Sequence, residues 1–198
     1  VNNQQSIKLS GALSDKVEDS LVVSSSHVDL KQFNPLLQAV KLKLEGELDG
    51  HITLSNIQNK LAFTGDVAAN NLVINDNIIG QALINTLYYP SSNHIALSGY
   101  TSMGIDDENG LPSKNISFKG AYYLNKKEES IDIDFSTKPA NLKLLNPLLE
   151  GILTINNGFV NGAGKVHGTP DNIKIDGKFR LFNSEVKVDY TNVVYNIT

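Results

Sequence analysis

The 198-residue sequence contains no cysteine, which excludes disulfide bonds, thiolate zinc sites and a cysteine nucleophile. It also has no apolar run as long as a membrane-spanning helix. Positive charge is scarce, because 17 basic residues face 21 acidic ones and no basic stripe is present, so nucleic acid is a poor partner. Residues 1–5 lack the charged and apolar regions of a signal peptide. We therefore expect the chain to be a fragment of a larger protein, with a membrane anchor outside it.

Residues that often perform chemistry are present, but their spacing does not fit a site. The four histidines are His27, His51, His94 and His167, and none is paired with another at the spacing of metal ligands. The acidic stretch 106–110 lacks the spaced ligands and the distant glutamate of a calcium loop. Ser102 misses the Gly-x-Ser-x-Gly spacing of a hydrolase nucleophile. We therefore predict no catalytic residue, no metal and no cofactor, and a protein that is not an enzyme.

What the sequence does contain is an internal repeat. The stretch Asn34-Pro35-Leu36-Leu37 recurs 112 positions later as Asn146-Pro147-Leu148-Leu149. At the same offset, Gly46, Gly50 and Gly65 correspond to Gly158, Gly162 and Gly177. Residues 7–12 also resemble residues 116–121, with a three-residue change in length between the copies. A repeat unit that cannot cover its own apolar face stacks on the next unit, so we expect one elongated domain over residues 1–198, with copies at about 7–100 and 116–198.

Between these landmarks, apolar and polar residues alternate. Leu42, Leu44, Leu48, Ile52 and Leu54 share one parity, and the other parity carries lysine, glutamate, aspartate, histidine and threonine. Successive side chains of a strand point to opposite faces, so the pattern predicts strands with one apolar and one wet face. Nearly the whole chain follows this pattern, in pieces of five to nine residues, and no long amphipathic helix is expected. The predicted fold class is therefore all-β.

Some local predictions depend on turn chemistry. Residues 78–87 show helical spacing but strand-like flanks, and we expect a strand there. We expect a polar loop over residues 103–112 and a turn at Asn70-Asn71. Because a proline crowds the residue before it, we also expect Asn34 to avoid the helical region, with one short helical turn over 35–40.

Residues 142–198 carry an ordered set of motifs. A leucine-rich stretch with a proline (142–149) is followed by Gly158 and Gly162, by residues 166–170 (Val-His-Gly-Thr-Pro), by residues 177–181 and by an aromatic-rich close at 188–195. This order resembles the C-terminal repeat region of the TamB family, the translocation and assembly module proteins, whose relatives include AsmA-like and bridge-like lipid transfer proteins. The first copy departs from the pattern, because residues 54–57 lack the Gly-Thr-Pro signal.

The resemblance implies an elongated, open, curved sheet of antiparallel or mixed strands, folded like a taco with an apolar concave face. It implies a place in the periplasm or cell envelope of a diderm bacterium, with an inner-membrane anchor outside this chain. It further implies an Omp85-family partner in the outer membrane, and a role in phospholipid movement to that membrane or in assembly of its proteins. The family pattern brings no catalytic residues.

The apolar parity admits three interpretations: a groove for phospholipid acyl chains, a sheet whose open edge pairs with a client strand, and the self-filled core of a spacer. The alternation alone favours the self-filled core, and the resemblance to the TamB family shifts the expectation to the first, a section of a groove between the inner and outer membranes. The alternative is an assembly module that acts with an Omp85-family partner by strand pairing. The residues expected to line the groove are Leu42, Leu44, Leu48, Ile52, Leu54, Phe63, Val67, Ile116, Phe118, Ile131, Ile133, Phe135, Leu153, Ile155, Ile173, Ile175, Phe179, Leu181, Val186 and Val188. The expected pairing edge consists of Val193, Val194, Tyr195 and Ile197.

Overall fold

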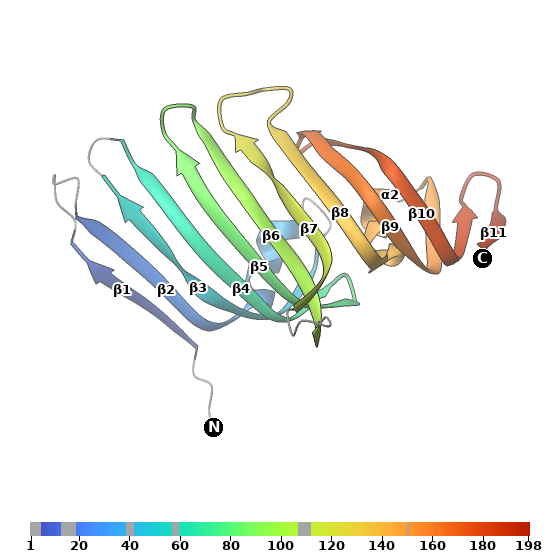
Figure 1. Cartoon of the computed structure of the whole chain (residues 1–198), viewed down its shortest axis with the longest axis horizontal. Coiled ribbons are helices and arrows are strands. Elements are labelled where there is room, and N and C mark those ends of the chain that lie inside the picture. Colours follow the sequence, from blue (N-terminus) through green and yellow to red (C-terminus); the bar gives the residue numbers. More distant parts are fainter. Residues whose placement is uncertain (1–4, 13–18, 39–41, 57–59, 107–111, 150) are drawn as a thin grey trace.

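The structure is a computed structural model that describes residues 5–12, 19–38, 42–56, 60–106, 112–149 and 151–198. In this part of the chain, eleven strands form one open sheet, and each strand pairs antiparallel with its neighbours in sequence (Figure 1). The all-β prediction is confirmed, and of the two expected sheet types the antiparallel one is found. A strictly sequential order requires only short connections between neighbouring strands, which agrees with the many turn signals of the sequence.

The strands are β1 (Ser6–Gly11), β2 (Ser20–Asp29), β3 (Leu44–Ser55), β4 (Ala62–Ile74), β5 (Asn77–Tyr89), β6 (His94–Asp106), β7 (Pro112–Tyr123), β8 (Ile131–Asn141), β9 (Leu153–Thr169), β10 (Asn172–Val188) and β11 (Val193–Ile197). Two short helical segments interrupt them. The first joins the 3-10 turn η1 (Leu30–Phe33) to α1 (Asn34–Leu37), and the second joins η3 (Leu142–Leu145) to α2 (Asn146–Leu149). We call β2, η1, α1, β3 and β4 the first module, and β8, η3, α2, β9 and β10 the second module.

The strand predictions were right in kind and wrong in length. Residues 78–87 lie within β5, so the expected strand is confirmed. The polar loop expected over 103–112 is shorter than predicted, because β6 continues to Asp106 and β7 begins at Pro112. β9 and β10 each run for 17 residues, far beyond the expected pieces. The Asn70-Asn71 turn is also wrong, because both residues lie inside β4 at a β-bulge, where Asn71 has a φ of 51°. A bulge bends a strand without ending it.

The same bulge recurs in both modules. Asn71 in β4 and Asn183 in β10 have positive φ values of 51° and 49°. Each lies across from a glycine with a φ of 125°, Gly46 or Gly158. At Gly46 a Cβ atom would lie 2.6 Å from the Asn70 carbonyl oxygen, and so only glycine fits. The repeated glycines of the sequence therefore mark positions of close backbone approach.

The prediction for Asn34 was wrong. Asn34 has helical dihedrals (φ −55°, ψ −37°) although Pro35 follows it. Its side chain accounts for this, since Oδ1 accepts a hydrogen bond from the Leu44 N–H (2.7 Å) and Nδ2 donates one to the Leu44 carbonyl (3.0 Å). Asn146 forms the same two bonds with Ile155, at 2.8 and 3.1 Å. Two hydrogen bonds from one side chain fix the point where the chain returns to the sheet, and they offset the steric preference before proline.

The helical segments pack on the apolar face of the sheet and close two hydrophobic cores. In the first module Leu30 is 5% exposed and packs with Leu72 and Ile79. In the second, Leu142 and Ile155 are each 3% exposed and pack with their neighbours in β9 and β10. The two helical segments lie on the same side of the sheet in Figure 1. Each core is therefore built around one helical segment, and the first core also includes Ile79 and Ala82 of β5.

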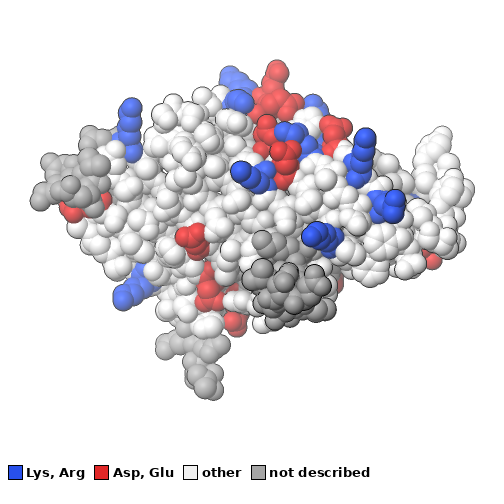
Figure 2. Space-filling model, viewed as in Figure 1, with Lys and Arg blue, Asp and Glu red and all other residues white. Residues whose placement is uncertain are grey.

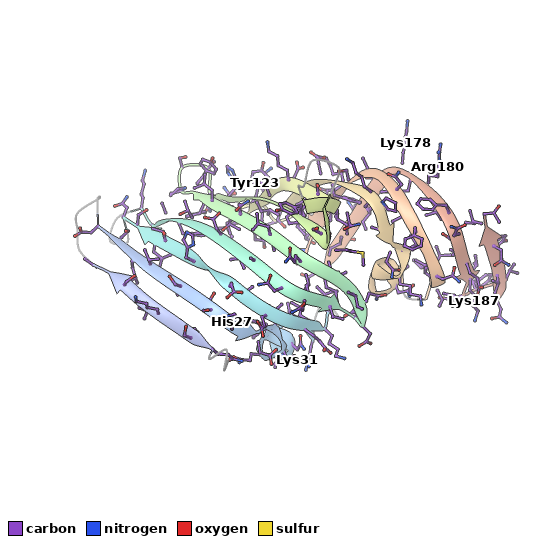
Figure 3. The ribbon with its side chains drawn as sticks, turned by 60° about the horizontal axis from the view of Figure 1, so that its bottom comes forward. His27, Lys31, Tyr123, Lys178, Arg180 and Lys187 are labelled. Carbon is purple, nitrogen blue, oxygen red and sulfur yellow. The ribbon has the colours of Figure 1, made fainter. Side chains whose placement is uncertain are left out.

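The sheet curves toward this apolar face. Ile78 of β5 and Asn183 of β10 line one cavity, although five strand spacings separate their strands. In a flat sheet, five spacings of ~4.8 Å would place them roughly 24 Å apart. Figures 1 and 3 show the elongated sheet twisting and bending along its length. The apolar face is thus concave, as predicted.

Candidate functional site

The strand register gathers the predicted groove residues on one face. Directly paired residues of antiparallel strands point to the same side, and Leu54 pairs with Phe63, and Val166 with both Ile133 and Ile175. One rung across the sheet passes through Leu9, Val23, Ile52, Gly65, Thr86, Leu97, Gly120, Ile133, Val166 and Ile175. None of these side chains is charged.

We call the predicted groove residues from Leu44 to Val188, together with this rung, the apolar trough. Leu42 does not belong to it. It precedes β3, and its N–H donates to the Leu37 carbonyl oxygen (3.2 Å) in the turn after α1. None of the predicted groove residues lies in β1, β2, β5 or β6. Three apolar residues of these strands do belong to the trough. Val23, Ile84 and Leu97 are each paired with a trough residue of a neighbouring strand and therefore lie on the apolar face. Helical spacing in β5 and short apolar runs in β2 obscured this placement in the sequence.

The trough is covered at one end and open at the other. Near the helical segments Ile155 and Val186 are 3% and 8% exposed. Farther along the same strands Ile175 and Phe179 are 39% and 40% exposed, and Ile52 in the first module is 40% exposed. A contiguous set of large apolar side chains left in water marks a surface that binds something apolar. The protein therefore fills only part of its own apolar face.

Glycines deepen the trough in the second module. The Phe179 ring lies over Gly164 and Gly177, where an added Cβ would lie 2.7 and 2.5 Å from its Cζ atom. Phe179 also stacks on Phe135, with ring centroids 5.7 Å apart and an interplanar angle of 19°. Together with Val160 and Ile175, these rings line a small apolar pocket of about 110 Å³. Flat rings over a glycine floor give a smooth apolar wall, and Thr137 and Asn141 are the polar residues that also line the pocket.

A larger cavity of about 550 Å³ is lined by residues 76–79, by residues of β6 and β7 and by the second module, and we call it the junction cavity. It touches both cores, through Ile79 of the first and Ala140 of the second. It shares Ile116, Ala140 and Asn141 with the small apolar pocket, so the two are adjacent. Its polar lining residues are Asp76, Asn77, Thr101, Asn115, Asn141, Lys143, Asn157 and Asn183. The junction cavity thus joins a polar rim to the apolar trough.

The outer face carries ion pairs. Figure 2 shows acidic and basic side chains mixed over the middle strands, without a large patch of one sign. Lys165 bridges Asp132 and Asp134, which raises the pKa of the lysine. The His167 ring bonds to Asp176 (2.7 Å) and to Glu129 (3.1 Å), and these two carboxylates raise the pKa of the imidazole. These exposed pairs link neighbouring strands on the face opposite the trough, where solvent keeps the contribution of each pair small.

The other three histidines also have defined partners. His27 bonds to Glu47 at 3.0 Å, His51 faces Asp66 at 3.5 Å, and His94 stacks between Tyr89 and Tyr123. Among the described residues, no group of histidine, aspartate and glutamate is arranged to hold a metal ion. Within the same ranges, no helix has the length and hydropathy needed to cross a membrane.

The predicted pairing edge is the last strand of the sheet. Val193 and Tyr195 of β11 lie opposite Val188 and Val186, on the apolar face, and Val194 lies opposite Lys187 on the outer face. Among the described strands, β11 has β10 on one side and no strand on the other. Comparisons with protein-family models, with curated proteins and with solved structures gave no match for this chain. The resemblance to the TamB family therefore stays a prediction.

Proposed function

We propose that this chain is a section of a groove that carries phospholipid acyl chains across the periplasm, between the inner and outer membranes of a diderm bacterium. The observation that carries the proposal is the apolar trough, which runs across the sheet without a charged side chain and keeps Ile52, Ile175 and Phe179 about 40% exposed. A spacer with a self-filled core would cover these side chains, since each buried methylene gains ~0.8 kcal/mol. The resemblance to the TamB family points to the same role.

The energetics and the dimensions suit this role. Removing a 16-carbon chain from a bilayer exposes apolar surface worth on the order of 10 kcal/mol, at ~0.8 kcal/mol per methylene. Contact with the aliphatic and aromatic side chains of the trough replaces that surface with one of the same kind. Nine strand spacings of ~4.8 Å, from β1 to β10, make the trough about 43 Å long. One acyl chain spans roughly 15 Å, half of a ~30 Å hydrocarbon core. A chain can therefore move along the trough between sites of similar energy, with its head group in water.

Photo-crosslinking tests the proposal with a control one residue away. A photoreactive amino acid at Ile175 lies in the trough, and the same amino acid at Asp176 points to the outer face. We expect phospholipid to be labelled from position 175 and, in a second pair, from Ile133 but not from Asp134. Equal labelling from both faces, or labelling from the aspartate positions alone, would contradict the proposal.

The open edge of β11 supports a second candidate, an assembly module that pairs with a strand of a client protein or of an Omp85-family partner. Val193, Val194 and Tyr195 are 44%, 45% and 54% exposed, and among the described strands β11 has a neighbour on one side only, so the backbone groups of its other edge are available for pairing. We expect an extended apolar peptide to bind this edge, and its backbone N-methylated form to bind at least tenfold more weakly. Equal binding of both peptides would exclude backbone pairing.

A further inference from the structure

Lys31 and Lys143 occupy the same position in the two modules. Each is the second residue of a 3-10 turn, and its backbone N–H donates to the side chain of the residue before that turn. The acceptor is Asp29 Oδ1 in the first module (2.9 Å) and Asn141 Oδ1 in the second (3.0 Å). Figure 3 shows Lys31 beside His27, where β2 runs into η1. The two lysines are therefore held by the same backbone arrangement.

Their charged ends meet different surroundings. The Lys31 ammonium lies 3.2 Å from a carboxylate oxygen of Glu45, which follows the strand residue that Asn34 binds. In the second module the residue that follows the equivalent strand position is Asn156. The Asn156 amide donates to Glu185 (2.6 Å) across to β10. An amide thus stands where the first module has the carboxylate that neutralises its lysine.

Lys143 lines the junction cavity. Among the described residues, no carboxylate lies within ion-pair distance of its ammonium group. Asp76 also lines the cavity, but its carboxylate pairs with Lys43 at 3.1 Å. Lys143 therefore brings an uncompensated positive charge to the rim of the cavity.

The remaining lining of the junction cavity has two kinds of surface. Asn157 and Asn183 contribute side-chain amides, and neither side chain forms a hydrogen bond with another described residue. Ile78, Ile79 and Ile116 contribute apolar surface, and Ile116 also lines the adjacent apolar pocket. At about 550 Å³ the cavity lies in the range of small-molecule sites, roughly 300–1,000 Å³. The cavity offers an ammonium group and amide N–H donors, and Ile116 connects it to the adjacent apolar pocket.

We propose that the junction cavity is a binding site for one glycerophospholipid. The phosphate is bound by the Lys143 ammonium and by the amide groups of Asn157 and Asn183, and one acyl chain passes Ile116 into the apolar trough. The assignment rests on the proposed function, in which the trough holds acyl chains. The site adds one defined binding position for the head group along a trough that otherwise contacts acyl chains alike. It also restricts the transported lipids to those with a phosphate near the glycerol.

The chemistry selects a phospholipid rather than a free phosphate or an uncharged lipid. One lysine at an open rim holds a small anion weakly in water, because solvent and salt screen a single exposed charge. The apolar lining adds affinity only when an acyl chain is attached to the same ligand. A diacylglycerol has the acyl chains but no charge, so its affinity does not depend on the sign of the charge at position 143. Only a molecule that carries both a phosphate and an acyl chain contacts the charged and the apolar parts of the site.

The test compares Lys143→Glu with the matched control Lys31→Glu in the full 198-residue chain. Each variant places a negative charge at the same backbone position of its module, which makes Lys31→Glu a control for the change of charge. Circular dichroism and urea unfolding show whether both variants stay folded. Three soluble probes are titrated calorimetrically: dihexanoylphosphatidylglycerol, dihexanoylglycerol and glycerophosphoglycerol. We expect the phospholipid to bind Lys143→Glu at least about tenfold more weakly than wild type, because a charge-assisted bond becomes a repulsion. Lys143→Gln is expected to fall between them, and Lys31→Glu to match wild type.

The probes separate the possible failures. The uncharged dihexanoylglycerol should bind wild type and Lys143→Glu equally, and glycerophosphoglycerol should show no saturable binding. Unchanged phospholipid affinity in Lys143→Glu, or the same loss in Lys31→Glu, overturns the head-group site and leaves the trough intact. Saturable binding of glycerophosphoglycerol alone overturns the part played by the acyl chain. If neither acylated probe binds wild type, the proposed function fails together with the site.

Discussion

The two modules share their backbone devices. In both, an asparagine side chain binds the backbone of the following strand at two points, Asn34 at Leu44 and Asn146 at Ile155. In both, an asparagine with positive φ lies across from a glycine at a bulge. These positions have little freedom, because they depend on side-chain amides or on the absence of a Cβ atom.

The linings of the modules differ. The corresponding trough positions hold Val23, Ile52 and Val67 in the first module and Phe135, Gly164 and Phe179 in the second. Corresponding polar positions differ too, with Glu45 beside Lys31 in one module and Asn156 in place of the glutamate in the other. The backbone devices therefore fix how a module bends and closes, and the lining is free to become aliphatic, aromatic or charged. This separation lets one repeated fold present different surfaces along a single path.

The largest effect is expected from removing a leucine that closes a core. Leu142→Ala should lower the free energy of unfolding by about 2–5 kcal/mol, because Leu142 is 3% exposed and its loss leaves a cavity. The mirror change Leu30→Ala should give a similar loss in the first module, where Leu30 is 5% exposed. Urea unfolding measures both, and hydrogen exchange shows which module opens. Leu36→Ala is the control, since Leu36 is 79% exposed and its loss should stay within about 0.5 kcal/mol. A loss of protection in both modules from one change would refute independent cores.

The next effect concerns the asparagine that both modules share. Asn146→Ala should destabilise by roughly 2–4 kcal/mol, because the N–H and the carbonyl of Ile155 each lose a partner worth about 1–3 kcal/mol. Asn146→Asp keeps the acceptor for the N–H and loses only the donor, so its loss should be about half. The same two changes at Asn34 should give the same ranking. Urea unfolding measures the loss for each variant. A different ranking in the two modules would show that the same hydrogen-bond geometry contributes differently to the free energy of unfolding.

Glycine substitution separates the two linings. Gly177→Ala places a Cβ 2.5 Å from the Phe179 ring and 2.7 Å from the Ala163 carbonyl oxygen, so we expect a loss of about 1–3 kcal/mol. At the equivalent Gly65 the closest atoms are Thr86 Oγ1 at 2.9 Å and Ile52 Cγ1 at 3.3 Å, both in side chains that can rotate. Gly65→Ala should therefore be tolerated better in the same unfolding experiment. If Gly177→Ala is the milder change, the aromatic wall does not depend on its glycine floor.

The sequence predicted the faces of the sheet well because alternation is a local signal. Ile52 and Ile175 lie on the apolar face for the same reason that their neighbours lie on the other face. The bulge at Asn71 was predicted as a turn, since both features use a residue with positive φ and only the partner strand distinguishes them. Leu42 shows a related limit, because the parity of a strand continues in sequence past the point where the strand begins.

The junction cavity lay beyond sequence reasoning for a physical reason. It depends on curvature that brings Ile78 of β5 near Asn183 of β10, and curvature comes from bulges whose positions the alternation does not reveal. The sequence does indicate that Lys143, which has no ion-pair partner among the described residues, differs from Lys31 in its surroundings. The repeat matches it to Lys31, and a one-residue shift after the helical turn matches Glu45 to Asn156. The shift follows from the structure, where Asn34 binds Leu44 and Asn146 binds Ile155.

The smallest effect is the pH dependence that comes from His167, which stands in the second module at the position of Ser55 in the first. Asp176 and then Glu129 raise the pKa of His167, so this stabilisation is complete below its ordinary value of 6.5 and is lost as the pH rises through the raised value. His167 lowers the pKa of Glu129, whose contribution is present above its ordinary value of 4.5 and is lost as the pH falls through the lowered value. The contribution should thus be greatest between those two ordinary values and shrink with salt, since the groups are exposed. NMR titration should give His167 a higher pKa in wild type than in Asp176→Asn, and equal values in the two proteins would mean that the pair across β9 and β10 does not form in solution.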